Sequence, residues 1–307
     1  MENTAKNFAL QLGSLVSLYV TIVGLIMLMF SVITAHYPDA AQGYWEVESA
    51  ATSLRFSIAM LVVFFPVYLL LTRLVNNVRR NEHGTYLMLT KWLIYLSLLV
   101  GGAAILGDLV GVINGFLNGE LTIRFALKAL SFFVVVATAF VYYLFDAKGY
   151  WQTHEQESVI YGVGATVIVI AALVLGFMNT QTPNEVRGYR LDSTQTNDLS
   201  LIQSNIESFN SNNGALPQTL DEAFLGIEVP VAPEGRADYE YRVIGPTTYE
   251  LCATFANESS RAEQQQYAEP MYVDDSYMKG NMYWTHGAGE WCFERKVAPL
   301  GLKPLMQ

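Results

Sequence analysis

The sequence is poor in charged residues, cysteine and histidine. Only 15% of its 307 residues are charged, and it holds two cysteines and four histidines. It has no nucleophile and base in the arrangement of known hydrolases, no phosphate-binding loop, no zinc-protease motif and no dinucleotide fingerprint. These absences argue against an enzyme. We expect no catalytic residue, no metal ion and no cofactor.

Apolar residues, in contrast, are abundant and come in long runs. They make up 52% of the chain, and the mean hydropathy is positive. A helix needs about 20 residues to cross a hydrocarbon layer of roughly 30 Å. Five runs reach that length, at about residues 10–35, 54–75, 87–114, 122–145 and 159–178. The sequence therefore predicts a membrane protein whose first partner is the lipid bilayer.

The basic residues between these runs predict the orientation of the chain. The connection between the second and third runs is basic and Lys148 follows the fourth, whereas residues 36–53 contain three acids and no Lys or Arg. Basic loops stay in the cytoplasm. We therefore expect a multi-pass membrane protein with its N-terminus in the cytoplasm. Its parts are a cytoplasmic tail (1–8), a four-helix transmembrane domain (9–146), a cytoplasmic loop (147–158), a fifth transmembrane helix (159–179) and an extracytoplasmic domain (180–307).

Acidic residues are concentrated in the expected extracytoplasmic domain. Residues 1–179 carry a net charge of −1 and residues 180–307 a net charge of −9, which together give the −10 of the chain. Such a domain repels nucleic acid and anionic lipid headgroups. A protein partner outside the cytoplasm fits it better.

The third and fourth runs contain charges within otherwise apolar helices. Counting residues from the expected outer ends places Asp108 and Lys128 at the same depth, about 9 Å below the surface. Arg124 lies one turn from Lys128, and Arg55 and Glu120 lie toward the same side. One interpretation is an ion or proton pathway, and the other is a structural ion pair that fixes the register of the hairpin. Because only one acid lies at depth, the structural pair is favoured.

The third run also carries small residues at four-residue spacing. Ala103, Gly107, Gly111 and Gly115 form a stripe that predicts close packing against another helix.

Several motifs in the first four runs resemble the bacterial family DUF5671. The resemblance covers about residues 8–148, and its motifs are Leu54-Arg55 through Phe65-Pro66-Val67-Tyr68, Lys91-Trp92-Leu93, Gly107-Asp108-Leu109, Asn118-Gly119-Glu120-Leu121-Thr122 with Arg124 and Lys128, and Tyr142-Tyr143-Leu144 with Asp146. The resemblance implies a four-helix membrane domain in bacteria, and with it the bacterial inner (plasma) membrane as the location. It implies no established activity and therefore assigns no catalytic residue.

The C-terminal part predicts a small α+β fold. Apolar residues at three- and four-residue spacing indicate one long helix from about residue 185 to Asn213-Gly214. Residues 238–244, 248–255 and 289–294 alternate as strands do, and residues 245–247 fit a hairpin turn. The expected fold class is thus a membrane α-helical bundle of five helices plus an extracytoplasmic domain in which one long helix packs on an antiparallel sheet.

Both cysteines, Cys252 and Cys292, fall on expected strands of this domain. On the oxidising side of the membrane they predict a disulfide. The alternative is a metal site with His286, but the paired ligand spacing of zinc sites is absent.

Residues 187–217 resemble the helix and following turn of type II secretion pseudopilins. The motif includes Arg187, Asp198-Leu199, Ile202-Gln203 and Asn213-Gly214-Ala215-Leu216-Pro217. A pilin places its apolar helix directly behind a cleavable leader, whereas this helix follows earlier spans. The resemblance therefore implies a helix-plus-sheet fold and not a pilus subunit.

The segment 257–282 is polar, acidic and rich in tyrosine and methionine. Such residues are frequent at recognition surfaces, which predicts a partner surface at Tyr267, Met271, Tyr272, Tyr277 and Met278. An alternative is that these side chains cover the edge of the sheet.

Two functions follow from these observations. The first is a membrane protein whose helical bundle anchors an extracytoplasmic interaction or sensing domain. The alternative is a small transporter or channel component that uses the Asp108, Arg124 and Lys128 cluster.

Overall fold

The computed structural model of the chain describes residues 2–37, 44–81, 85–120, 122–259 and 283–297. The chain divides into two compact units, which we call the helical unit (residues 1–180) and the C-terminal unit (residues 181–307). Each is described by itself.

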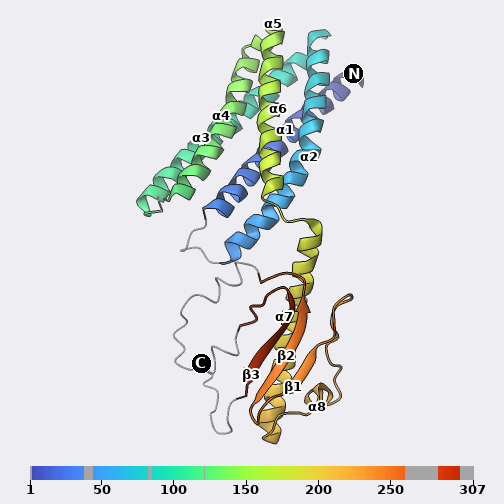
Figure 1. The fold of residues 1–307 in the computed structure, drawn as a ribbon. Helices are drawn as coiled ribbons and strands as arrows, with labels where there is room; N and C mark the ends of the chain where they lie inside the picture. Colours follow the sequence, from blue (N-terminus) through green and yellow to red (C-terminus); the bar gives the residue numbers. More distant parts are fainter. Residues whose placement is uncertain (1, 38–43, 82–84, 121, 260–282, 298–307) are drawn as a thin grey trace. The chain divides into compact units, whose positions relative to one another are not determined.

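The helical unit consists of long helices (Figure 1). They are α1 (Glu2–His36), α2 (Tyr44–Asn81), α3 (Thr85–Leu117), α4 (Ile123–Ala147) and α6 (Glu155–Met178), with the short α5 (Tyr150–Thr153) between the last two. Each long helix contains a segment that is long and apolar enough to cross a membrane. The prediction of five spanning-length helices is confirmed.

Helix α1 is the centre of this unit. It packs along α2 and also contacts α3, α4 and α6. Its Leu28 is completely buried in a cluster with Leu61 of α2 and Val169 of α6. A second cluster joins Leu15 of α1 to Ile94 of α3. Apolar contacts between helices thus hold the unit together.

Small residues allow close approach at some of these contacts. A Cβ atom added at Gly176 of α6 would come within 3.1 Å of Leu28 and 3.2 Å of Ile58. Added at Gly115 of α3, it would come within 2.5 Å of the Phe125 ring. At Gly107 and Gly111 it would meet no heavy atom within 4 Å. Only the end of the predicted small-residue stripe therefore packs against a helix among the described residues.

The C-terminal unit begins with one long helix and ends in a small sheet (Figure 1). Its elements are α7 (Pro183–Asn213), α8 (Leu220–Phe224), β1 (Glu240–Val243), β2 (Thr248–Phe255) and β3 (Gly289–Lys296). The strands form an antiparallel sheet in the order β1-β2-β3. The helix and the three strands are confirmed close to their predicted bounds, and α8 was not predicted.

Local chemistry sets both ends of α7. Thr182 and Glu185 form a capping box, in which each side chain accepts a hydrogen bond from the backbone N–H of the other. At the other end Gly214 has φ +73°, a left-handed conformation that ends helices and suits glycine. The predicted stop at Asn213-Gly214 is confirmed.

The core of the C-terminal unit lies between α7 and the sheet. Leu199, Ile202 and Ile206 of α7 are completely buried against Tyr249 and Leu251 of β2. Residues of α8 and β3 complete the same cluster. The spacing of the three α7 residues follows the helical period, as predicted.

Cys252 and Cys292 form a disulfide between neighbouring strands. They are direct partners in the register of β2 and β3, and the bond closes a sequence separation of 40 residues. Cys252 is buried, whereas Cys292 is exposed. The predicted pairing is confirmed. The ring of His286, the third residue of the alternative metal site, stacks on Phe255 with 3.6 Å between ring centroids.

Candidate functional site

The charges predicted to meet lie on the hairpin of α3 and α4. These helices pack antiparallel, with Gly101 against Phe140 and Gly115 against Phe125. Asp108 is seven residues from each of these glycines and so lies midway between the two contacts, level with about Phe132. Lys128 starts four residues closer to the tip of the hairpin, an offset of about 6 Å along the helix axis.

Lys128 of α4 faces a different neighbour from Asp108. The Lys128 Nζ atom lies 5.8 Å from the centroid of the Phe30 ring of α1, a cation–π distance. Arg124, one turn earlier, is buried. Asp108 is half-buried on α3, and its neighbours Leu109 and Val110 are exposed. In the described part of the chain, Asp108 forms no ion pair with Arg124 or Lys128, although both cations have other interactions.

The remaining two members of the predicted cluster are Arg55 and Glu120. Arg55 is half-buried on α2 and has interactions of its own. Glu120 is exposed at the tip of the hairpin, where its backbone N–H donates to the Gly115 carbonyl oxygen over 2.9 Å. In the described part of the chain, neither acid of the predicted cluster, Asp108 or Glu120, therefore forms an ion pair.

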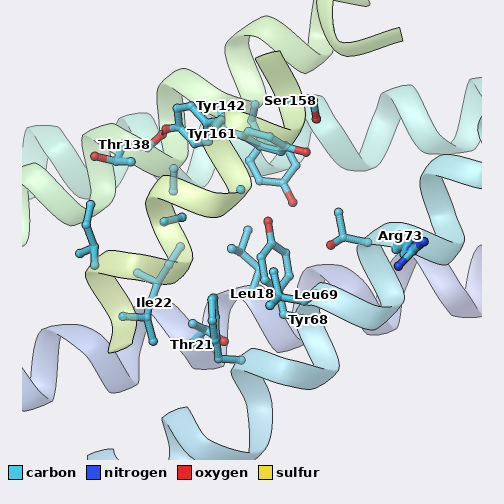
Figure 2. A pocket seen from close by; sticks show the side chains of 18 of the residues that line it. Leu18, Thr21, Ile22, Tyr68, Leu69, Arg73, Thr138, Tyr142, Ser158 and Tyr161 are labelled. Atoms are coloured by element: carbon cyan, nitrogen blue, oxygen red, sulfur yellow. The ribbon is translucent and has the colours of Figure 1, made fainter. Parts of the chain in front are cut away.

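A crevice lies between α1, α2, α4 and α6 of the helical unit. Its volume is about 1070 Å³, beyond the upper end of the roughly 300–1,000 Å³ of small-molecule sites. Figure 2 shows the labelled side chains that surround it, with Leu18 and Ile22 from α1, Tyr68 and Arg73 from α2 and Tyr161 from α6. Residues of four helices thus line one continuous space.

The crevice has a polar end and an apolar wall. At the polar end, α2 contributes Thr72, Arg73 and Asn76, and the first turns of α6 contribute Ser158 and Tyr161. The wall that continues from it is apolar and includes Leu18, Leu25, Phe65, Ile168 and Val169. A hollow of this composition suits an amphipathic molecule.

Aromatic rings fix the polar end. Tyr142 of α4 stacks on Trp151 of α5, with ring centroids 5.3 Å apart, and lies 5.4 Å from Tyr161 of α6. Trp151 Nε1 donates to the backbone oxygen of Tyr142 over 2.9 Å, and the Tyr161 hydroxyl donates to the backbone oxygen of Thr138. These contacts join α4, α5 and α6 near the short turns that connect them.

The sequence contained one signal for the crevice. Tyr68, Thr72 and Asn76 stand at positions i, i+4 and i+8 of an apolar helix and therefore share one face. This polar stripe marks the α2 side of the crevice. Its counterparts on α4 and α6 are single residues in apolar runs, and nothing in their local sequence relates them to α2.

A second group of polar residues organises the C-terminal unit. The Asp192 carboxylate of α7 is buried and accepts four hydrogen bonds, from Arg236, from the backbone N–H of Ala256, and from the backbone and side chain of Asn257, at 2.7–3.1 Å. Gly188, one turn before, leaves room for Asn257, whose Nδ2 would lie 2.5 Å from an added Cβ. With all its partners inside the unit, Asp192 has a structural role.

Burial shifts the pKa of several groups around this core. Burial lowers the pKa of the Arg295 guanidinium to about 10, although the group stacks on Trp284 at 4.2 Å and donates to Gln203. The pKa of Tyr239 is raised, mainly by burial and to a smaller extent by the hydrogen bond to Asp198. Tyr241 has its pKa raised to about 12, chiefly by burial.

An apolar segment of the C-terminal unit is exposed. Residues 225–231, which we call the apolar loop, hold Leu225, Ile227 and Val231 at 74%, 70% and 73% exposure. Leu225 has φ +49°, which is unfavourable for a residue with a side chain. Its neighbours include four exposed acids, namely Asp221, Glu222, Glu228 and Glu234. Three separated aliphatic residues give no periodic signal, so the sequence does not predict this loop.

The predicted partner surface of the long acidic segment lies elsewhere. Tyr267, Met271, Tyr272, Tyr277 and Met278 are outside the described residues.

The architecture defines a class: five apolar helices of spanning length suggest a multi-pass membrane protein, followed by a small α+β unit. Within it, residues 7–144 match the model of the family described as "Domain of unknown function (DUF5671)". The match supports the family resemblance of the first four long helices. No curated protein and no solved structure matches the chain.

Proposed function

We propose that the protein is a multi-pass protein of the bacterial inner membrane, in which the helical unit anchors the C-terminal unit as a binding module outside the cytoplasm. The N-terminus is cytoplasmic in this proposal, since basic residues follow α2 and α4. The disulfide supports the external placement, because such bonds persist in oxidising compartments. The likeness of residues 187–217 to pseudopilins belongs to this proposal as a likeness of fold only.

The observation that carries the binding role is the apolar loop. The C-terminal unit already buries a complete core between α7 and the sheet. It nevertheless exposes Leu225, Ile227 and Val231 within seven residues, and Leu225 does so in an unfavourable backbone conformation. Strained and exposed apolar positions are retained at recognition sites more often than elsewhere.

The partner that fits this loop is a protein with an apolar pocket and a basic rim. Four exposed acids neighbour the three aliphatic side chains. The one arginine of residues 220–240, Arg236, is engaged with Asp192 at 2.7 Å and does not offset their charge. Opposite charge on the partner would guide its approach and weaken with salt.

Site-specific photo-crosslinking in cells tests the binding role. A benzoylphenylalanine at Ile227 of the full chain should yield one discrete adduct, and the same probe at Ser200, an exposed position of α7, should not. The purified pair should dissociate as salt rises from 0.1 to 0.5 M. Equal adducts at both positions, or binding that ignores both salt and the change Ile227→Ser, would overturn the role.

The orientation has its own test. A cysteine placed at Ser200 should react with a membrane-impermeant maleimide in intact cells, and a cysteine placed at Lys148 should react only after the membrane is broken. The reverse pattern would contradict the proposed topology.

A further inference from the structure

We propose that the crevice of the helical unit holds one anionic phospholipid of the surrounding bilayer, with its phosphate at Arg73 and an acyl chain along the apolar wall. The proposal rests on the membrane insertion proposed above. It is independent of the partner of the C-terminal unit, so either proposal can fail without the other.

The lining of the crevice carries a positive charge, which favours an anionic ligand. Arg73 is the one charged residue among the described residues that line it. In the described part of the chain, its guanidinium has no hydrogen bond and no ion pair. A guanidinium presents five N–H donors in a planar fork that matches the oxygens of a phosphate. An acidic lining residue, which would repel a phosphate, is absent from the described lining.

Neutral polar groups accompany this cation at the same end. Thr72 and Asn76 flank Arg73 on α2, and Ser158 lies in the first turns of α6. The Thr72 hydroxyl is hydrogen-bonded to Ser14 at 2.9 Å and to Tyr68, and these bonds hold it in place at this end of the crevice. Hydroxyl and amide groups beside an arginine suit the glycerol and phosphate oxygens of a lipid headgroup.

The rim of the crevice shows where its occupant enters. Leu70, Leu74, Val159 and Ile168 line the crevice and are 51–64% exposed. The inner wall, in contrast, is formed by residues such as Leu25 and Val169, which belong to the buried core. An opening framed by exposed aliphatic side chains leads into hydrocarbon when the helices span a membrane. The occupant therefore enters from the bilayer and not from water.

The length of the crevice fits one leaflet. From Ser158 to Val169 on α6, eleven helical steps cover about 16 Å. A leaflet contributes half of a hydrocarbon layer of roughly 30 Å, or about 15 Å. An acyl chain lying along α6 from the polar end would therefore reach the end of the apolar wall.

Lipid retention by the full-length protein tests the head group. After extraction from bilayers of equal phosphatidylglycerol and phosphatidylcholine, native mass spectrometry should show phosphatidylglycerol retained about tenfold over phosphatidylcholine, as expected for a hydrogen-bonded charge pair. The change Arg73→Gln should bring the ratio close to one. Lys91→Gln is the matched control, because it removes an exposed cation of α3 that does not line the crevice.

A pair of glycines on α6 tests the apolar wall. A Cβ added at Gly162 or at Gly164 meets no heavy atom within 4 Å, but only Gly162 lines the crevice. Gly162→Phe should fill the space and abolish lipid retention, while Gly164→Phe should leave it unchanged. Gly162→Leu replaces the Phe variant if circular dichroism shows that the latter has lost its helices.

Three retention results would overturn the proposal. They are equal retention of the two lipids by the unaltered protein, loss of the preference in Lys91→Gln as well as Arg73→Gln, and equal effects of the two glycine changes. Dodecyl phosphate distinguishes the source of the ligand, since it carries the same head chemistry in water. Displacement of the lipid only at a large excess of dodecyl phosphate supports the bilayer source, whereas displacement at equimolar amounts points to a soluble amphiphile and overturns it.

Discussion

Polar side chains bond to different partners in the two units. In the helical unit, serine and threonine hydroxyls donate mainly to carbonyl oxygens of their own helix, as in Ser17 to Gly13, Thr21 to Ser17, Ser31 to Met27, Ser97 to Leu93, Ser131 to Leu127 and Thr166 to Gly162. The hydroxyls of α7 in the C-terminal unit do the same, but in this unit charged side chains also link distant segments, with Asp192 reaching 44 residues to Arg236 and Arg295 reaching 92 residues to Gln203.

This difference follows from the surroundings that each unit needs. A helix in hydrocarbon must satisfy its polar groups within itself, and association of helices then depends on close apolar packing. A small unit in water has little core to bury and gains stability from specific links between its elements. Single substitutions of polar residues should therefore destabilise the C-terminal unit more than the helical unit. Four measurements test that comparison.

The largest loss is expected from the disulfide. Replacing both Cys252 and Cys292 by serine should destabilise the C-terminal unit by about 4 kcal/mol, because the bond restrains a loop of 40 residues in the unfolded chain. Denaturant unfolding of the full chain, followed by tryptophan fluorescence, measures the loss. The thermal transition of the helical unit should stay where it is, and a joint shift of both transitions would break the comparison.

The next largest loss is expected at Asp192. Asp192→Ala leaves the nearly buried Arg236 charge and two backbone N–H groups without their acceptor, which should cost about 3 kcal/mol. Asp221→Ala, at an exposed acid of the same unit, is the control and should change the free energy of unfolding by less than about 0.5 kcal/mol. Equal losses of stability in Asp192→Ala and Asp221→Ala would contradict the structural role of Asp192.

Tyr239 should contribute a smaller, pH-dependent amount. Its hydroxyl donates to Asp198 over 2.6 Å, and Tyr239→Phe should cost about 1 kcal/mol, a low value for a bond to a carboxylate because the ring is only half-buried. Since the folded state raises the pKa of Tyr239, the contribution is complete below the unfolded value near 10 and is lost as the pH rises through the folded value.

Phenolate absorbance measures this titration directly. Between pH 9 and 11, Tyr239→Phe should leave the absorbance change of the folded protein unaltered, because Tyr239 keeps its proton there. A smaller absorbance change in Tyr239→Phe would show that Tyr239 ionises in this range and would contradict the assignment.

The smallest effect is expected at Asp108. Asp108→Asn should change the stability of the helical unit by less than about 0.5 kcal/mol, since the carboxylate has no ion pair in the described part of the chain. Asp146→Asn, the same change at a buried position of α4, should cost more. A proton or ion pathway through Asp108 predicts instead that the first change abolishes flux in proteoliposomes, which would revive the transporter alternative.

The sequence predicts elements whose pattern is local. Hydropathy over 20 residues was sufficient for the five long helices, and alternation in 248–255 gave β2 to the residue. The short α8 was not predicted, because its five residues, Leu220–Phe224, are too few to show a helical period. The disulfide was predicted from the expected oxidising compartment and from the positions of Cys252 and Cys292 on expected strands. Both can be read from the sequence.

Relations between elements were harder to predict. The alignment of Asp108 with Lys128 assumed that α3 ends near Asn114, but it continues to Leu117, so Asp108 lies about one turn deeper. Which face of α4 meets α1 depends on packing, and so does the crevice, whose lining residues come from four helices between Leu18 and Val169. Local sequence patterns do not contain this information.

The disulfide has one more consequence, for a chain that is cut. It joins the central strand β2 to β3 across the entire connection between them. A protease that cleaves anywhere between Ala256 and Gly289 would therefore leave both fragments attached to one another. The nicked protein would run as one band on a non-reducing gel and as two after reduction, with β3 still paired in the sheet and still tethered, through α7, to the helices.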